Sequence, residues 1–292
     1  MKHHVIIAIA VVLAQTPQAF ASTELDKWRL SSYISIVDST IVRSPEETEN
    51  WNGRIKDSEF RFERQDDGFQ TYISLDLAHP KTLLLDWQLR WNKFLKYFNA
   101  TLGRKVPNMT FEAVTTTDSL VTSARSGVVD SLVFRDLMFG IGTRYGVLEL
   151  SGEISGGIRR GGFAKEDSNS HRHAYLNVRA HLPHGIETQL GHRWNTLDTP
   201  IYAAGFRYKK HVSLEIIYFR NEIQWYILAQ KEFRNRFTFV SRYERLIGHN
   251  RKTIGILLNA TQKENEPTIH FKTNLVVAKD WLILSQLLVR VP

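Results

Sequence analysis

Arginine and lysine side chains are the residues of this sequence whose type and spacing most clearly indicate a function. Arg104, Lys105 and Arg125 lie in a long stretch, 104–130, that lacks the pattern of regular structure. Further arginines stand on the polar side of alternating segments: Arg90, Arg179, Arg193, Arg207 and Arg242. Cations around a narrow aqueous passage would attract a passing anion and replace part of its hydration. The same residues could instead be solvated loop charges or partners of nearby carboxylates.

Acidic residues share the polar faces of the same segments. They are Glu63, Asp76, Asp86, Glu187, Glu215 and Glu244. An arginine that bridges to a carboxylate adds little net charge, so a preference for anions would be weak unless the stretch 104–130 concentrates positive charge. If the polar faces enclose an aqueous pore, we assign Arg104, Lys105 and Arg125 to its constriction and the other five arginines to its lining.

Five histidines form a cluster in the sequence that could be considered for metal binding. They are His171, His173, His181, His184 and His192. A zinc site takes three or four ligands whose binding atoms converge. His181 and His184 have opposite strand parity and straddle a turn, so convergence is not expected. The chain has no cysteine, which excludes disulfides and thiolate metal sites. We predict no metal and no cofactor.

His211, Ser213 and Glu215 hold the residue types of a hydrolase triad. Nothing in their spacing distinguishes them from the polar face of a strand beside a turn. We therefore predict that the protein is not an enzyme.

Segments with alternating apolar and polar residues must carry these charges. Between residues 202 and 246, four such segments follow one another almost without a gap. Successive side chains of a strand point to opposite sides, so the pattern predicts antiparallel hairpins with two different faces. The apolar face holds Phe206, Leu214, Trp225 and Phe239, and the polar face holds Arg207, Glu215, Gln224 and Arg242.

About sixteen such segments, within a range of roughly 12 to 18, have the ~10-residue length of tilted transmembrane strands. Burying their charged faces between two sheets would cost several kcal/mol for each unpaired ion, and a water-filled lumen avoids that cost. We predict an all-β fold, an antiparallel transmembrane β-barrel with the stretch 104–130 folded inward. A periplasmic β-sandwich is the alternative, since its core would accept the same large aromatic residues.

The N-terminus predicts export. A short positive start, the apolar run 5–14 and an Ala19-Phe20-Ala21 cleavage signal form a secretory signal peptide over residues 1–21. Residues 22–292 would then be one barrel domain in the bacterial outer membrane. The net charge of +8 favours anionic partners, namely lipopolysaccharide and small anionic solutes. Nucleic acid is not expected as a partner of an exported chain.

One part of the chain resembles a known family. The run Leu102-Gly103-Arg104-Lys105-Val106-Pro107, followed by Phe111-Glu112, is similar to a Gly…Lys…Pro…Glu segment of phosphate-selective porins of the O/P type. In that family the segment ends a strand and opens an inward-folded constriction loop, a place that residues 119–130 would occupy here. The resemblance implies a trimeric, sixteen-stranded porin that favours anions. The chain is short for the family, which implies trimmed loops or fewer strands.

These observations predict an outer-membrane channel through which small hydrophilic solutes, preferably anions, diffuse passively. Outer-membrane lipid would surround the barrel, and a homotrimer is its expected assembly. The alternative function is that of a barrel without a channel, either a lipid-modifying enzyme or a structural or export component of the envelope.

Overall fold

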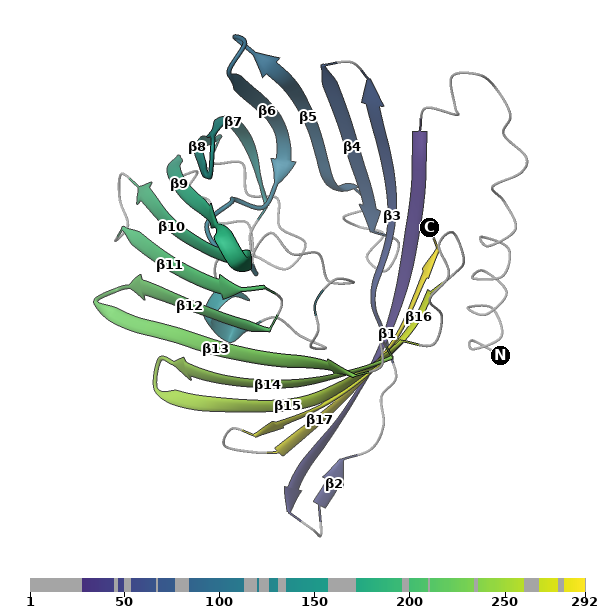
Figure 1. Cartoon of the computed structure of the whole chain (residues 1–292). Coiled ribbons are helices and arrows are strands. Elements are labelled where there is room, and N and C mark those ends of the chain that lie inside the picture. The colour runs from purple at the N-terminus through teal and green to yellow at the C-terminus, as the bar shows by residue number, and fades with distance from the viewer. Residues whose placement is uncertain are drawn as a thin grey trace, which may run out of the picture.

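The described residues form one sheet of seventeen strands that curves into a barrel (Figure 1). The predicted signal peptide, residues 1–21, lies outside the residues that this computed structural model describes. The described residues are 28–44, 47–49, 54–66, 68–76, 84–112, 120, 126–130, 135–156, 172–195, 200–209, 211–233, 236–259, 268–277 and 281–291.

Strands account for nearly all of the regular structure. They are β1 (Trp28–Ser44), β2 (Glu47–Glu49), β3 (Arg54–Asp66), β4 (Phe69–Asp76), β5 (Leu84–Phe94), β6 (Phe98–Lys105), β7 (Asp136–Tyr145), β8 (Leu148–Ser155), β9 (His173–Leu182), β10 (Ile186–Asn195), β11 (Ile201–Tyr208), β12 (Val212–Phe219), β13 (Glu222–Phe233), β14 (Phe237–Leu246), β15 (His249–Asn259), β16 (Thr268–Val277) and β17 (Trp281–Val291). Helix α2 (Gly127–Asp130) precedes β7, and the turn η5 (Pro183–Gly185) joins β9 to β10. No helix among the described residues is long and apolar enough to cross a membrane.

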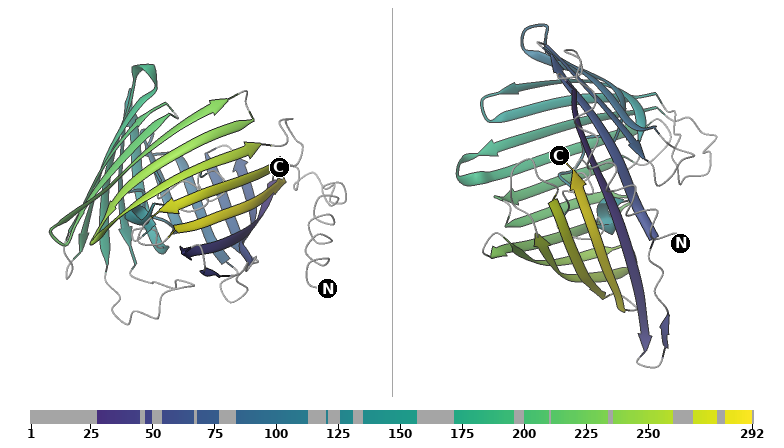
Figure 2. Two further views of the ribbon diagram at one scale, coloured as in Figure 1. Left: turned by 90° about the horizontal axis from the view of Figure 1, so that it is seen from below. Right: turned by 90° about the vertical axis from the view of Figure 1, so that its right-hand side faces the viewer.

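Strand β1 closes the barrel because it pairs with strands from both ends of the chain. Its residues 32–42 pair with β17 and its residues 28–37 pair with β3, in both cases antiparallel. Strands β1 and β17 lie side by side in both views of Figure 2. From β3 to β17, each strand pairs with its neighbours in sequence.

Strand β2 adds no position to this ring. It pairs with residues 41–44 of β1, beyond the part of β1 that pairs with β3. The ring therefore has sixteen of the seventeen strands. This confirms the predicted antiparallel barrel and its strand number, and the short length of the chain does not come from fewer strands.

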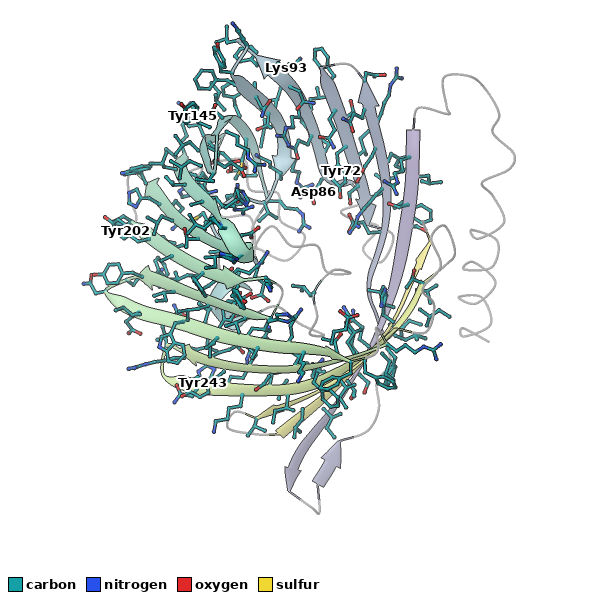
Figure 3. The ribbon with its side chains drawn as sticks, viewed as in Figure 1. Tyr72, Asp86, Lys93, Tyr145, Tyr202 and Tyr243 are labelled. Atoms are coloured by element: carbon teal, nitrogen blue, oxygen red, sulfur yellow. The ribbon has the colours of Figure 1, made fainter. Side chains whose placement is uncertain are left out.

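The two faces of the sheet differ in chemistry, as the alternation predicted. On β14, Phe239 is 49% exposed, whereas Arg242, of the opposite parity, is 2% exposed. In Figure 3, Tyr202 projects outward from the barrel and Asp86 lies on its inner side. Large apolar side chains that are exposed on the outer face include Leu190, Ile216, Ile227, Ile254 and Phe271. The apolar face is the outside of the barrel, and the charged face is the inside.

The connections between strands define two unlike ends. At one end, which we call the short-turn end, turns of two or three residues join the strands from β3 to β14 in pairs. Asp66 and Gly68 of one predicted turn lie at this end, and Gly68 has a φ of 89°, which glycine adopts without steric cost. The other end, the loop end, carries the longest connection, residues 106–135 between β6 and β7.

Aromatic side chains surround the outer face near both ends. At the loop end, the ring centroids of Trp225 and Tyr243 lie 5.4 Å apart, and at the short-turn end those of Phe69 and Trp91 lie 5.8 Å apart. Further members are Trp194, Tyr202 and Tyr218 at the loop end and Phe94, Phe98 and Phe233 at the short-turn end. Transmembrane barrels carry such girdles at the two membrane–water interfaces. The position of Trp91 therefore suits a girdle rather than the core of a sandwich.

Candidate functional site

The segment between β6 and β7 enters the barrel from the loop end and lies against the inner wall. Its described residues are 106–112, 120 and 126–130, and we call these residues the inner loop. The inner loop forms hydrogen bonds with side chains on β8, β12, β14 and β16. This confirms the predicted inward fold of the long stretch.

Three carboxylates of the inner wall accept backbone N–H groups of the inner loop. The bonds run from Asn108 N to Glu153 Oε2 at 3.3 Å, from Glu112 N to Glu215 Oε1 at 2.8 Å, and from Gly127 N to Glu244 Oε1 at 2.9 Å. A buried backbone N–H that is left without an acceptor costs about 1–3 kcal/mol. These carboxylates therefore act as anchors that fix the position of the inner loop.

Arginines complete the anchor around Glu112 and Glu244. Arg242 Nη1 lies 3.4 Å from Glu112 Oε1, and Arg242 Nε lies 3.6 Å from Glu244 Oε2. Arg251 forms a second ion pair with Glu244. Glu112 Oε1 also accepts the N–H of Ser126 at 2.9 Å, which joins the two arms of the inner loop. Since Arg242, Glu112 and Glu244 are all buried, this network stands apart from solvated surface ion pairs.

Apolar contacts and one lysine hold the rest of the inner loop. Lys272, which is 1% exposed, donates from Nζ to the carbonyl oxygen of Leu120 at 2.6 Å. A buried cluster joins the inner loop to inward-facing residues near the loop end: Met109, Val128 and Val129 pack with Met138, Tyr175, Ile201, Ala203, Ile217 and Tyr226. Burial of apolar area adds stability in proportion to that area.

Two glycines of the inner wall make room for the inner loop. A Cβ atom placed on Gly191 would lie 2.6 Å from the carbonyl oxygen of Met109. A Cβ atom placed on Gly205 would lie 2.8 Å from the ring of Phe111. Both distances are shorter than real contacts, so any larger residue would force a shift. Strands β10 and β11 thus lack a side chain where the inner loop comes closest.

Phe111 lies between two of the arginines that the sequence assigned to a pore lining. The Cζ atoms of Arg179 and Arg207 lie 5.1 Å and 4.5 Å from the centroid of its ring. Arg179 also donates to Gln189 Oε1 at 3.1 Å, and Arg207 Nη1 lies 3.8 Å from Glu187 Oε2. Guanidinium groups are attracted to aromatic faces, so Phe111 holds both cations at the edge of the inner loop.

The three residues assigned to the constriction differ in their surroundings. Lys105 Nζ lies 2.5 Å from Glu153 Oε1, so its charge is paired locally. Arg104 is the residue before it on β6 and interacts electrostatically with Asp86 and Arg135. Arg125 lies outside the described residues.

The remaining lining arginines do not gather at one place. Arg90 shares the inner face of β5 with Asp86, and its Nε is buried without a hydrogen-bond partner among the described residues. Arg193 on β10 is 6% exposed. Arg242 belongs to the loop anchor, as described above. The structure therefore brings together Arg179 and Arg207, at Phe111, and separates the others.

Sequence reasoning missed two charged clusters of the inner wall. Arg135, which precedes β7, donates from Nε to Asp86 Oδ1 at 2.9 Å. On β3, Arg61 Nε lies 2.9 Å from Glu59 Oε1, and Tyr72 donates to the same oxygen at 3.1 Å. Because Glu59 and Arg61 are two residues apart on one strand, their shared face could have predicted the second pair. Arg135 lies one residue before β7, and nothing in the sequence indicated that Asp86 would be its partner.

The histidines occupy unlike environments. His181 lies between two carboxylates, with Nε2 3.3 Å from Glu149 Oε2 and Nδ1 3.3 Å from Glu187 Oε1. His192 packs against the outward Trp194 at a centroid distance of 3.9 Å. Within the described part of the chain, no group of three or more potential ligands is arranged to hold a metal ion. Of the possible hydrolase residues, Glu215 is taken up by the loop anchor.

Solved structures of bacterial porins have a similar fold. A triple mutant of Rhodopseudomonas blastica porin superposes with a TM-score of 0.55 at 12% identity, over 90% of this chain and 99% of that chain. Salmonella typhi OmpF in complex with daunomycin gives 0.61 at 9% identity, over 90% and 97%. Pseudomonas aeruginosa OpdQ gives 0.52 at 12% identity, over 90% and 96%. The chain has the fold of these porins.

Sequence comparison adds nothing to this structural likeness. No protein-family profile matches the chain, and no curated protein matches it in sequence. Identities of 9–12% establish the porin fold alone. The narrower resemblance to O/P-type porins rests on the run from Leu102 to Glu112 and its flanking strands.

Proposed function

We propose that this protein is a porin of the bacterial outer membrane, through which small hydrophilic solutes diffuse passively. The observation that carries the proposal is the inner loop, anchored inside a closed ring of sixteen strands. An exposed apolar outer face with aromatic girdles suits a bilayer, and a charged inner face suits water. A segment fixed against the inner wall sets the width of the remaining lumen without any chemical step.

A preference for anions is the finer part of the proposal. Glu215 and Glu244 of the inner wall accept backbone N–H groups of the inner loop, whereas Arg179 and Arg207 lie against Phe111 of that loop, with Glu187 beside Arg207. Around Asp86, the cations Arg104 and Arg135 lie near two carboxylates, Asp86 itself and Glu59. A net positive zone raises the local concentration of anions and lowers the barrier to their passage. Phosphate would be one such anion if the O/P-type resemblance extends to selectivity.

The proposed partners follow from the same placement. Outer-membrane lipid would contact the apolar outer face, and lipopolysaccharide would contact the loop end. A homotrimer is the assembly that the O/P-type resemblance implies. Sedimentation of the purified protein in detergent tests the trimer separately from the channel, because a single barrel already encloses a complete ring.

Conductance in a planar lipid bilayer tests the proposed function. Folded protein should give discrete ion-conducting steps, and a KCl gradient should give a reversal potential that favours chloride. Heat-dependent mobility on a gel first establishes that the sample is a folded barrel. Folded protein without conducting steps would reject the porin and favour a barrel that has an enzymatic, structural or export role. A reversal potential that favours potassium would reject the anion preference and keep the channel.

A further inference from the structure

Two neighbouring hairpins at the short-turn end expose side chains that the channel does not use. They are residues 93–97, the end of β5 and its turn to β6, and residues 144–147, the end of β7 and its turn to β8; we call these residues the tip patch. Leu95, Tyr97 and Tyr145 are 73%, 69% and 85% exposed. In Figure 3, Lys93 and Tyr145 lie at the outer rim of the barrel, away from Asp86. The tip patch is therefore a surface of the rim and not part of the lumen.

The two turns form one continuous surface. Strand β6 pairs with β7, and Phe98 at the end of one turn lies opposite Thr143 at the start of the other. Thr143 Oγ1 donates to the carbonyl oxygen of Tyr97 at 2.8 Å, which ties the turns together. Side chains from both turns can therefore contact the same group.

Every charged residue of the tip patch is a cation. Lys93, Lys96 and Arg144 are exposed, and the sequence contains no acidic residue in either turn. Lys96 Nζ lies 5.1 Å from the centroid of the Tyr97 ring. Lysine over an aromatic ring recurs along the same end, at Lys209 with Tyr208 and at Lys231 with Phe233.

The turn 93–97 holds its side chains outward at a conformational cost. Lys93, Leu95 and Lys96 have φ values of 59°, 48° and 67°, a region in which glycine is normally favoured. Non-glycine residues in such conformations are concentrated at binding sites, where their side chains are needed. Lys93, Leu95 and Lys96 thus occupy positions at which glycine would be less strained.

We propose that the tip patch binds the phosphate group of anionic glycerophospholipids in the leaflet at the short-turn end. This inference rests on the proposed placement in a membrane. Phe94 and Phe98 of the outer girdle flank the turn, so the tip patch stands at the level of the lipid headgroups. Lysine and arginine near an anionic bilayer surface attract its lipids, and tyrosine suits the same boundary because it is both apolar and polar.

Retention of lipid by the whole purified protein tests this assignment. The protein in detergent is mixed with equal amounts of phosphatidylglycerol and phosphatidylcholine, and bound lipids are counted by native mass spectrometry. We expect phosphatidylglycerol to be preferred. A triple variant, K93Q/K96Q/R144Q, should weaken that preference by about tenfold or more. The matched control is R220Q/R245Q/K252Q, which removes three exposed cations at the loop end and should keep the preference.

Each other outcome overturns the inference. Equal retention of the two lipids would show that the protein does not select an anionic headgroup. An unchanged preference in K93Q/K96Q/R144Q, or an equal loss in the control, would place lipid binding elsewhere. In a second mixture, of phosphatidylglycerol and lipid A, a preference for lipid A would reject a glycerophospholipid. Conductance in phosphatidylcholine bilayers is measured in parallel, so a failure of the channel is distinguishable from a failure of lipid binding.

Discussion

The backbone N–H of Glu112 donates a hydrogen bond of 2.8 Å to Oε1 of Glu215, although 103 residues separate them in sequence. Glu215 is completely buried, and its carboxylate faces the inner loop rather than open solvent. Equivalent bonds to Glu153 and Glu244 show that carboxyl groups of the inner wall have a structural use. The anion preference that we propose is then a consequence of how the inner loop is held.

Removal of the Glu215 carboxylate should release the first arm of the inner loop. In Glu215→Leu, the buried N–H of Glu112 loses its acceptor, which costs about 1–3 kcal/mol. We expect a lower denaturant midpoint of unfolding and a larger, noisier single-channel conductance. Glu232→Leu changes an exposed glutamate at the short-turn end and should leave both quantities unchanged. Wild-type conductance and stability in Glu215→Leu would show that this bond does not hold the inner loop.

A methyl group on the inner wall should displace the inner loop without any change in charge. Gly205→Ala would place a Cβ atom 2.8 Å from the ring of Phe111, and overpacking of this kind costs about 1–3 kcal/mol. The expected result is reduced stability with altered conductance. Gly152→Ala is the control, because its Cβ atom would meet its nearest neighbour, Tyr175 O, at 3.9 Å. Equal behaviour of the two variants would mean that Phe111 can move aside freely.

The three cations assigned to the constriction should differ in their effect on selectivity, because their ion-pair partners differ. Arg104→Ala, Lys105→Ala and Arg125→Ala combined should shift the reversal potential toward cations, because the positive zone is weakened. Lys105 is already paired with Glu153, so Lys105→Ala alone should contribute least. Glu153→Gln should act in the opposite direction, since it leaves Lys105 unpaired while the amide oxygen can still accept from Asn108. Unchanged selectivity in all of these variants would place the filter elsewhere in the lumen.

The outer face should reject charge in a way that the inner face does not. Ile227 lies near the middle of β13, is 42% exposed and belongs to the apolar face. Ile227→Arg should cost about 2–4 kcal/mol for folding into lipid vesicles, the penalty for arginine near the bilayer midplane. Gln230→Arg, of the inward parity on the same strand, is the matched control and should fold nearly normally. A similar cost at both positions would argue against a lipid-facing outer wall.

Alternation made the strands and their faces predictable, because a period of two residues is a local property of the chain. Phe239 and Arg242 could be assigned to opposite faces without knowledge of any partner strand. The anchors could not be predicted in this way. Lys272 reaches Leu120 across 152 residues, and no local pattern specifies which carboxylate or lysine meets which part of the inner loop.

Positions whose role depends on the path of the inner loop were the least predictable. Arg135 precedes β7 and pairs with Asp86 across 49 residues, so its role depends on where the inner loop leaves the wall. Gly191 and Gly205 look in the sequence like ordinary small residues of a strand. Both glycines leave space for the inner loop. Gly191 does so for Met109, 82 positions earlier, and Gly205 does so for Phe111, 94 positions earlier. Turn residues such as Leu95 likewise carried no pattern that predicted their exposure.

The pairing of β1 with both β3 and β17 has a consequence for synthesis and folding. The first described strand, β1, can pair early with β3, but its second partner is β17, the last described strand. Until β17 is available, β1 presents an open edge with unpaired backbone groups, which is prone to pair with other chains. Folding to a closed ring must also overcome the entropy of joining residues about 250 positions apart, which makes formation of this contact slow. The nascent chain therefore needs protection of that edge until its final strand arrives.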